Sequence, residues 1–435
     1  MVASRLAAVS LLGCSGVVDL AVLSMHTSPL AQPGTGDGGG MNVYVRELAA
    51  ALARSGVRCE VFTRADSPDC AAVVPVEPGF RVHHVPAGHL GPVPKEDLPG
   101  LVGEWADGVA ARLGGLRAEG FRCSAIHANY WLSGVAGHRL KHELDVPLIS
   151  TFHTLDRVKA EASPEEILSA EPVRRASAEA EIVGCSDAVL ASCSVEARQL
   201  VDLYDADPSR ILLVPPGVDH AFFGPGDRTR ARRAIGVDQG DPLVLFVGRI
   251  QPLKGLGVVV EALSRLVGAP GRPGRANLVV VGGPSGPEGA AELARIRTRI
   301  AELGLAGRAR LVPPQPHAML STYLRASDVC VVPSRSESFG LVALEAGACG
   351  VPVLASAVGG LVTLVDEGVT GHLLDPHDPE QWAASLAALL ADPAAAAGLG
   401  RAGAARAAAY TWSAAAATLR DCLERIAERD LVACR

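Results

Sequence analysis

Short apolar segments alternate with helical segments along most of this chain, and this rhythm constrains the fold more than any other feature. Apolar runs bounded by turn residues predict buried strands. The first series of predicted strands comprises residues 18–25, 57–63, 82–85, 125–127, 147–151, 188–192 and 211–214. The second series comprises residues 243–247, 278–281, 309–312, 329–332, 351–355 and 371–374. Strands that alternate with helices form mostly parallel sheets, so the sequence predicts an α/β fold.

The alternation is interrupted at residues 215–219, where P-P-G-V-D predicts a stiff turn. A chain of 435 residues is long enough for two domains. We therefore predict two Rossmann-like domains that face a central cleft, over residues 1–215 and 216–395. The Ala-rich chain from 379 to 431 is predicted to be helical. Its last part, residues 396–435, is predicted to be a helical segment that crosses back onto the first domain.

Composition argues against several classes of protein. The net charge is −7, the 40 basic residues are spread out and aromatic residues make up only 4%, so we expect no nucleic-acid partner. The sequence has no run of ~20 apolar residues, so we expect no membrane span. Ten cysteines occur without a C-x-x-C pair. That pattern predicts free thiols in a reducing, cytoplasmic compartment rather than disulfides or a zinc site.

The start of the chain has two interpretations. Residues 1–22 are mildly apolar and include Arg5, as in a weak signal peptide. They lack a clean apolar block, however, and they lead directly into a strand that the fold requires. We therefore favour a simple extension, disordered over residues 1–16.

A glycine-rich loop follows the first predicted strand. Gly34, Gly36 and Gly39 match G-x-G-x-x-G, the dinucleotide fingerprint. Two observations argue against NAD. The glycines begin about eight residues after the strand, and the second strand has no acidic residue at its tip, because Glu60 comes too early. Such a loop can instead wrap a phosphate or a sugar with backbone N–H groups, and a plain surface loop is the alternative.

The second domain carries a pair of cations and a pair of carboxylates near strand ends. Arg249 and Lys254 lie in G-R-I-Q-P-L-K-G, and together they can neutralise a pyrophosphate leaving group. Surface salt bridges are the alternative. Glu337 and Glu345 lie in S-E-S-F-G-L-V-A-L-E-A, where Gly340 precedes a helix whose free N–H groups can bind phosphate.

Glu345 is surrounded in sequence by apolar residues, so its carboxylate needs partners, and ribose hydroxyls are suitable ones. Glu337 would bind the transferred sugar. A helix-capping Glu337 and a solvated Glu345 are the plainer alternative. Arg249, Lys254, Glu337 and Glu345 together predict a nucleotide-sugar site that needs no catalytic metal, and no D-x-D motif for a chelated divalent ion accompanies them.

The predicted loops of the first domain bring cations and hydroxyls to the opposite side of the cleft. Lys95, Tyr130, Thr154 and Arg175 lie at predicted loop tips or on a nearby helix. Cations combined with hydroxyls suit a phosphorylated acceptor. Taken singly, each of these residues is more commonly a surface residue, and His153 is as readily a satisfied loop histidine as a catalytic contact.

The paired-glutamate segment resembles the motif of retaining family-4-type glycosyltransferases with two Rossmann-like domains (GT-B architecture). Over about residues 18 to 425, the segments H-T-S-P-L-A-Q-P-G-T-G-D-G-G-G-M-N-V-Y, N-Y-W-L-S-G-V-A-G-H, V-G-R-I-Q-P-L-K and P-P-Q-P-H resemble the actinobacterial D-inositol-3-phosphate glycosyltransferases of mycothiol synthesis. The resemblance implies a UDP-N-acetylglucosamine donor, a 1D-myo-inositol 3-phosphate acceptor and anomeric retention. Both substrates are small molecules, and a homodimer is left open.

The resemblance also assigns residues. The donor would contact Gln32, Pro33, Gly40, Arg249, Lys254, Gln315, Glu337 and Glu345. The acceptor would contact His26, Asp37, Gly38, Gly39, Gly40, Met41, Asn42, Lys95, Tyr130, Thr154 and Arg175. The predicted catalytic residues are His153, Arg249, Lys254 and Glu337. A structural Mg²⁺, with no catalytic role, would be bound mainly by backbone oxygens at Leu324, Arg325, Ser327 and Val351.

The chain departs from that family at two places. Asn129 stands where the family has histidine, and residues 156–181 diverge. These departures keep open a paralogous glycosyltransferase with another small acceptor. Three further classes stay open as well, namely a UDP-sugar 2-epimerase, a non-catalytic sugar-nucleotide sensor and an NAD-dependent dehydrogenase.

A retaining double displacement requires a carboxylate nucleophile beneath the anomeric carbon. The first-domain loops offer no suitable one, because Asp37 lies too close to the expected phosphate. We therefore expect front-face attack, in which the acceptor hydroxyl enters on the side of the leaving group and a phosphate oxygen takes its proton.

Overall fold

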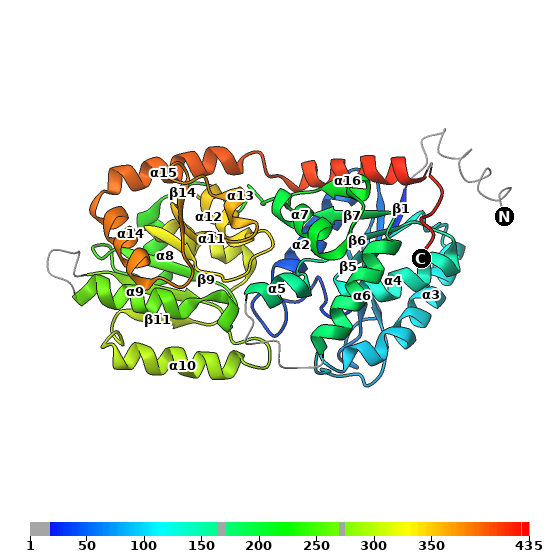
Figure 1. Cartoon of the computed structure of the whole chain (residues 1–435), viewed down its shortest axis with the longest axis horizontal. Coiled ribbons are helices and arrows are strands. Elements are labelled where there is room, and N and C mark those ends of the chain that lie inside the picture. The colour runs from blue at the N-terminus through cyan, green and yellow to red at the C-terminus, as the bar shows by residue number, and fades with distance from the viewer. Residues whose placement is uncertain (1–17, 163–170, 269–274, 428, 435) are drawn as a thin grey trace.

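The computed structural model describes residues 18–162, 171–268, 275–427 and 429–434. Two α/β domains lie side by side, each built on its own sheet (Figure 1). Residues 1–17 lie outside the described residues, and so does the predicted extension over residues 1–16. The prediction of two α/β domains with mostly parallel sheets is confirmed.

The first sheet has eight strands in the order β3-β4-β2-β1-β5-β6-β7-β8. Its strands are β1 (Asp19–Leu23), β2 (Arg58–Arg64), β3 (Val73–Glu77), β4 (Phe80–Val85), β5 (Ala125–Asn129), β6 (Leu148–Thr151), β7 (Ala188–Ala191) and β8 (Ile211–Leu213). All neighbouring pairs are parallel except β3 and β4.

The second sheet has six strands, all parallel, in the order β11-β10-β9-β12-β13-β14. Its strands are β9 (Leu243–Val247), β10 (Asn277–Val281), β11 (Ala309–Val312), β12 (Val329–Val332), β13 (Val353–Ser356) and β14 (Gly371–Leu374). The strand order reverses beside β1 in the first sheet and beside β9 in the second. Such switch points are where open parallel sheets bind ligands, outside the carboxyl ends of the strands.

Helices cover both faces of each sheet. The first domain contains α2 (Gly40–Arg54), α3 (Val102–Ala118), α4 (Trp131–Leu144), α5 (Asp156–Ala162), α6 (Glu171–Cys185) and α7 (Ser194–Tyr204). The second contains α8 (Arg228–Ile235), α9 (Leu256–Gly268), α10 (Gly289–Glu302), α11 (His317–Ala326), α12 (Leu341–Ala348) and α13 (Leu361–Leu364). The C-terminal helices are α14 (Pro379–Ala391), α15 (Pro393–Ala407) and α16 (Trp412–Ala427).

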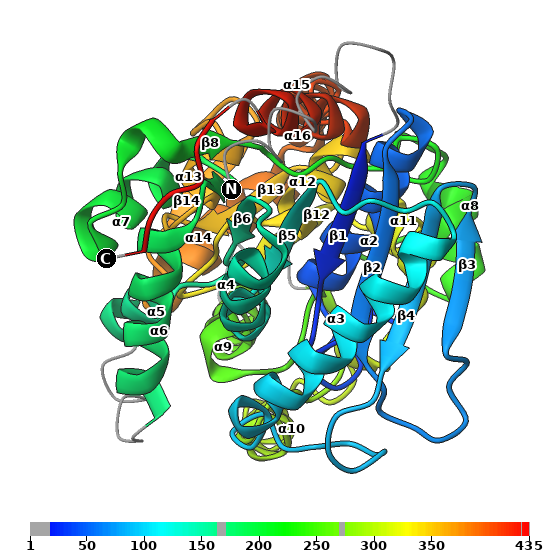
Figure 2. The same cartoon turned by 90° about the vertical axis from the view of Figure 1, so that its right-hand side faces the viewer.

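Helix packing explains why the strands are apolar on both faces. Side chains from α3, α4 and α6 pack on one face of the first sheet, and side chains from α2 and α16 pack on the other. Figure 2 shows α3 and α4 in front of that sheet. The second sheet is covered in the same way by α8, α11 and α12 on one face and α9, α10 and α14 on the other. Sheets buried on both faces require nearly continuous apolar strands, which is the pattern in the sequence.

The edge strand β3 is an element that the sequence analysis missed. It is short, contains Pro75 and is only partly buried, so it lacks the apolar run that marks the other strands. An edge strand tolerates proline when the position of the missing N–H faces solvent, because no hydrogen bond to a neighbouring strand is lost there.

The prediction of continuous helix from 379 to 431 is wrong. The segment forms three helices, because Pro393 ends α14 and the side chain of Asp392 accepts hydrogen bonds from the first N–H groups of α15. Only α16 crosses to the first domain, where it packs on α2, whereas α15 packs on α12. The boundary predicted at residue 396 therefore falls inside α15, a helix of the second domain.

The prediction that all cysteines are free is also wrong. Cys185, at the end of α6, is bonded to Cys434, with 4.8 Å between their Cα atoms. The other cysteines of the described chain are free. A pair separated by 249 residues carries no local sequence signal.

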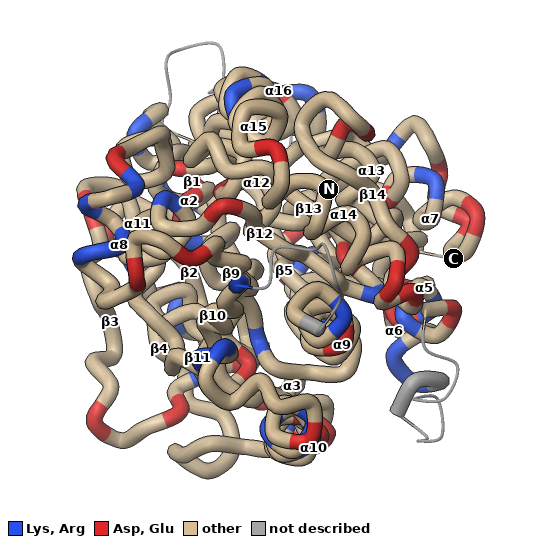
Figure 3. Tube along the Cα trace, turned by 90° about the vertical axis from the view of Figure 1, so that its left-hand side faces the viewer, with Lys and Arg blue, Asp and Glu red and all other residues tan. Residues whose placement is uncertain are grey.

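In the view of Figure 3, basic and acidic residues are interspersed along the trace of the chain. Within the described residues, no single helix is long and apolar enough to cross a membrane. One pair, Pro379–Ala391 with Pro393–Ala427, meets the length and composition test only jointly, and it is bent by 101°.

The contact between α16 and α2 generates a stability prediction. Leu419 of α16 is fully buried in the cluster that it shares with α2. Leu419→Ala should lower the free energy of unfolding by about 2–5 kcal/mol, because it removes buried methyl groups and leaves a cavity. Urea denaturation followed by circular dichroism measures the change.

The matched control is Glu424→Ala, an exposed position on the same helix, which should change the free energy of unfolding by less than about 0.5 kcal/mol. Equal effects of the two substitutions would contradict a stabilising role of the buried face of α16.

Candidate active site

A cavity of about 880 Å³ lies between the two domains and is lined by residues of both. Its walls are formed by loops that follow the carboxyl ends of strands. His26 follows β1, Tyr130 follows β5, and His153 follows β6. On the opposite side, Arg249 follows β9 and Glu337 follows β12. Parallel strands place their carboxyl ends at one edge of a sheet, so residues far apart in sequence meet here.

The glycine loop of the first domain reaches the second domain. A Cβ atom at Gly39 would lie 3.3 Å from Nε of Arg249, and one at Gly34 would lie 3.2 Å from Cβ of Pro314. The absence of a side chain at these positions therefore permits the close approach of the two walls. Pro33, Asp37, Gly39, Gly40 and Met41, all predicted to contact substrates, line the cavity.

Asn42 has a different place from the one predicted. Its Nδ2 donates hydrogen bonds to Thr27 Oγ1 at 2.6 Å and to the carbonyl oxygen of Ser28 at 2.5 Å. Its Oδ1 accepts a bond of 2.8 Å from the N–H of Gly39. Asn42 thus fixes the glycine loop against the first turn of α2 and does not line the cavity. Gln32 and Gly38, also predicted contacts, do not line it either.

The cation and carboxylate pairs of the second domain are connected. Nζ of Lys254 donates to Oε2 of Glu337 at 2.6 Å, and Oγ of Ser334 donates to the same oxygen at 3.2 Å. Arg249 forms no ion pair within the described residues, and removal from water lowers its pKa. The salt-bridge alternative is therefore met for Lys254 but not for Arg249, and both side chains line the cavity.

Glu345 is buried, as its apolar neighbours suggested, and it has a protein partner that the sequence analysis missed. Nε2 of His317 lies 2.6 Å from Oε1 of Glu345. Burial of the imidazole lowers the pKa of His317, but the charge of Glu345 and this hydrogen bond raise the pKa more, so the pKa ends above its usual value. Both residues line the cavity. His317 belongs to the P-P-Q-P-H segment, and that motif was the signal that could have found it.

Gly340 is required for the conformation of the chain at the start of α12. Its φ is +103°, in the left-handed region, and a Cβ atom would lie 2.6 Å from Cδ2 of Leu361. Gly340 lines the cavity, where the N-terminus of α12 begins.

The ring of Tyr130 is the centre of the first-domain wall. His26 packs on it with 4.3 Å between ring centroids. Nζ of Lys95 lies 5.3 Å from the centroid, and Cζ of Arg175 lies 4.9 Å from it. Both cations are within the range of cation–π attraction. Burial, followed by the charge of Lys95, lowers the pKa of His26 well below its usual value, so this histidine is neutral.

Arg175 supports this wall from behind rather than lining the cavity. It is 5% exposed, and its Nε donates to Glu179 at 2.7 Å. Its Nη2 donates to the carbonyl oxygen and the hydroxyl of Thr154, at 2.7 and 3.1 Å. Thr154 and Arg175, both predicted to contact the acceptor, are therefore brought together, with Thr154 on the cavity side.

Lys159 is a cavity residue that the sequence analysis missed. Its pKa is lowered to about 7, first by removal from water and then by the charges of Arg175, Lys95 and Arg249. It lies on α5 within the segment that diverges from the resembled family, one helical turn after His153 and Thr154, which both line the cavity. That proximity to a cavity motif is the signal that could have found it.

His153 lies at the junction of the domains. Its φ is +61°, and its Nε2 lies 2.9 Å from Oδ1 of Asn129. An amide oxygen accepts only, so Nε2 carries the proton. Burial, and then the nearby His127, lowers the pKa of His153 to about 3, so the ring is neutral. Its carbonyl oxygen accepts a hydrogen bond from Ser338 of the second domain.

The remaining assignments separate into two groups. Gln315 lines the cavity, and its Nε2 donates to the carbonyl oxygen of Pro313 at 3.0 Å. The residues assigned to Mg²⁺ lie elsewhere, at the end of α11 and before β13. They are Leu324, Arg325, Ser327 and Val351, and none of them lines the cavity. The structural Mg²⁺ remains a prediction.

Glu60 bears on the dehydrogenase hypothesis. Its carboxylate accepts from Arg81 at 2.6 Å and lies 2.5 Å from Nε2 of His83, so it is occupied within the protein. It does not line the cavity. A dinucleotide site requires an acidic residue at the end of the second strand, where it binds the ribose. Among the described residues around this cavity, no acidic residue has that position.

Two family models match the chain. A glycosyl transferase 4-like domain matches residues 39–217, and the glycosyl transferases group 1 model matches residues 227–406. One match falls within each of the two domains that the structure shows.

Curated relatives match over nearly the whole chain. A D-inositol 3-phosphate glycosyltransferase from Segniliparus rotundus is 45% identical over 401 residues, which are 91% of this chain and 87% of the relative. One from Thermobispora bispora is 45% identical over 417 residues, 94% of this chain and 95% of the relative.

A solved structure also matches closely. A sucrose-phosphate synthase from Thermosynechococcus elongatus superposes with a TM-score of 0.86 and 33% identity, covering 94% of this chain and 99% of that one. The two-domain architecture, the shared cavity and these matches agree, and the chain belongs to the family of GT-B glycosyltransferases that includes the D-inositol 3-phosphate glycosyltransferases.

Proposed function

We propose that this glycosyltransferase transfers N-acetylglucosamine from UDP-N-acetylglucosamine to 1D-myo-inositol 3-phosphate, with retention of anomeric configuration. The names of the relatives support the acceptor. The donor sugar and the retention follow from the resemblance of the sequence motifs.

The observation that carries the proposal is the group of cations on the first-domain wall. Lys95 and Arg175 lie against the Tyr130 ring, and Lys159 lies close enough to both for their charges to lower its pKa. Arg249 approaches the group from the second domain. Like charges repel at this range, so an anion bound beside the two cavity lysines is favoured. A phosphorylated polyol would supply that anion and would present a hydroxyl toward the second domain.

The second-domain wall suits the other substrate. Arg249 and Lys254 would bind the diphosphate, and the free N–H groups at the start of α12 would add to them. Glu337, which pairs with Lys254, would bind hydroxyls of the sugar, and Glu345 would bind the ribose. His317 would hold the carboxylate of Glu345 in place through the hydrogen bond that it makes with Oε1.

The proposed chemistry is front-face attack. Three of the six acidic residues that line the cavity are already engaged, Glu196 by Ser192, Glu337 by Lys254 and Glu345 by His317. None of the three is a ready nucleophile for a double displacement. In the proposed step, the acceptor oxygen bonds to the anomeric carbon as the bond to the diphosphate breaks, and a leaving phosphate oxygen takes the hydroxyl proton.

Two groups of the protein would assist this step. Arg249 and Lys254 would stabilise the charge that develops on the leaving diphosphate. His153, neutral and held through Nε2 by Asn129, would orient the transferred sugar with its ring or backbone. The contact between Ser338 and His153 joins the domains beside the reacting groups, which favours exclusion of water.

The identity of the reaction is tested by mass spectrometry of products. Purified enzyme is incubated with UDP-N-acetylglucosamine and a panel of polyol phosphates, with inositol 3-phosphate first, and with the donor alone. A glycosylated inositol phosphate is expected, and proton NMR of its anomeric signal reads the configuration. A modified donor formed without acceptor would indicate an epimerase, and a product with another polyol alone would assign a different acceptor.

Lys254→Ala should lower kcat by ~10²-fold or more, because a charged contact to the leaving group is lost in the transition state. Steady-state kinetics with both substrates varied measures it. Lys95→Ala is the matched comparison, since it should raise the acceptor KM more than the donor KM. A near-normal kcat for Lys254→Ala would remove the leaving-group role.

Lys159 predicts a pH dependence. With a pKa of about 7, its amine loses its charge as pH rises through 7, whereas a phosphate monoester gains its second charge near pH ~6. The kcat/KM for the acceptor should therefore fall on the alkaline side in the wild type. Lys159→Arg, whose side chain stays charged, should lose that decline. Coincident pH profiles for the wild type and Lys159→Arg would contradict it.

A further inference from the structure

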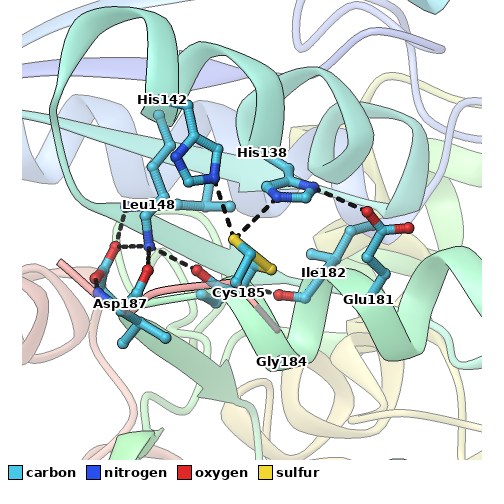
Figure 4. Close-up of a disulfide and its surroundings, with 12 residues drawn as sticks. His138, His142, Leu148, Glu181, Ile182, Gly184, Cys185 and Asp187 are labelled. Atoms are coloured by element: carbon cyan, nitrogen blue, oxygen red, sulfur yellow. Dashed lines mark hydrogen bonds and ion pairs between the residues drawn. A yellow bond between two sulfur atoms is a disulfide. The ribbon is translucent and has the colours of Figure 1, made fainter.

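A cluster of histidines and cysteines lies in the first domain, apart from the cavity. It joins three segments that are distant in sequence: α4, the end of α6, and the tail that follows α16 (Figure 4). None of its members lines the cavity between the domains. The cluster takes no part in the proposed glycosyltransferase reaction.

Four side chains of the cluster offer nitrogen or sulfur atoms. The atoms of His138, Cys185 and Cys434 all lie within 4.8 Å of one another. Nε2 of His138 lies 3.0 Å from Sγ of Cys434, and Nε2 of His142 lies 3.1 Å from the same sulfur. The two histidines are four residues apart on α4, so they share one face of the helix.

The tail is fixed at this place by interactions that do not involve sulfur. Lys141, which lies between the two histidines in the sequence, is fully buried, and its Nζ donates to the carbonyl oxygens of Cys185 at 2.7 Å and Val432 at 3.0 Å. Its charge is paired with Asp187 at 2.9 Å. Asp187 also accepts from the N–H of Val432 at 2.7 Å. These hydrogen bonds and the ion pair fix the tail, and they therefore hold Cys434 next to His138 and His142.

We propose that, when its two cysteines are reduced, this cluster binds one Zn²⁺ through His138, His142, Cys185 and Cys434. Two thiolates and two neutral imidazoles are a common tetrahedral zinc set, and a His-x₃-His spacing is typical of it. Thiolate ligands disfavour Mg²⁺ and Ca²⁺, which prefer oxygen. Two thiolates also balance the charge of the ion.

The surroundings of His138 support this assignment. Its Nδ1 lies 3.4 Å from a carboxylate oxygen of Glu181, on the side of the ring opposite to the sulfur (Figure 4). Histidines that bind metals commonly donate their second N–H to a carboxylate, which fixes the orientation of the ring. Glu181 would serve as this positioning residue.

Zinc binding requires that the disulfide first be reduced. A thiol reductant supplies two electrons and two protons to the bond between Cys185 and Cys434, and is itself oxidised to a disulfide. Zn²⁺ then replaces the two thiol protons, which pass to solvent. The sulfurs would separate to about 3.8 Å, given Zn–S bonds of ~2.3 Å in tetrahedral geometry. The bound ion would join the tail to α4 and α6 without a sulfur–sulfur bond.

The test measures metal in full-length protein that carries no histidine tag. The protein is reduced with a phosphine, supplied with Zn²⁺, freed of unbound metal and analysed by plasma mass spectrometry. About one zinc per chain is expected for the wild type. Cys434→Ser and His142→Ala, which change a tail residue and an exposed residue, should each lose most of it. Cys70→Ser and His377→Ala are matched controls outside the cluster and should keep it.

A second measurement is independent of stoichiometry. Co²⁺ in the site should give the visible absorption of a tetrahedral ion together with a thiolate charge-transfer band, and Cys434→Ser should lose that band. Glu181→Gln should weaken zinc affinity about 10- to 100-fold, as expected for a positioning carboxylate. Reduced wild-type protein without stoichiometric zinc, or the same zinc content in Cys434→Ser, would overturn the proposal and leave a disulfide alone.

Discussion

The packing of α16 on α2 is the contact on which the arrangement of the two domains depends. The chain of the second domain ends with α15, and α16 then crosses to the first domain. There it buries Trp412, Leu419 and Leu423 in the same cluster as Leu48 of α2. The N-terminus of α2 carries the glycine loop, which approaches Arg249. One apolar contact thus connects the relative position of the domains to the geometry of the cavity.

The two walls of the cavity differ in how their charged side chains are paired. On the second-domain wall, Glu337 and Glu345 each have a basic partner in the protein. On the first-domain wall, Lys95 and Lys159 gather near Arg175, whose own partner is Glu179. These three cations lie on the side where the acceptor is proposed to bind. A cluster of cations of this kind is costly in the free protein, and a bound anion offsets that cost.

The sequence predicted the fold well because its signal is periodic and apolar. Strands buried on both faces have a composition that single-sequence reasoning detects, and most predicted strands lie within a residue or two of the observed ones. The edge strand β3 and the breaks in the C-terminal helix escaped, since the first depends on pairing with β4 and the second on capping by Asp392.

The site was predictable to the extent that its residues stand in motifs next to strand ends. The sequence motifs predicted one site for Arg249, Lys254, Glu337 and Glu345, and the structure brings them to one cavity. The motifs could not distinguish Asn42, which fixes the loop, from residues that face the cavity, because that distinction depends on the direction of a side chain. Lys159 was missed because a lysine on a helix is ordinary until three other cations are seen around it.

The crossing of α16 has a consequence for synthesis on the ribosome. The first domain is complete in sequence by β8, but one face of its sheet, around α2, stays uncovered until α16 is made. The half of the molecule that emerges first can therefore finish burying its apolar surface only after α16 has left the exit tunnel. The apolar surface of the nascent first domain is therefore exposed to aggregation while nearly two hundred further residues are added, from Leu213 to Trp412.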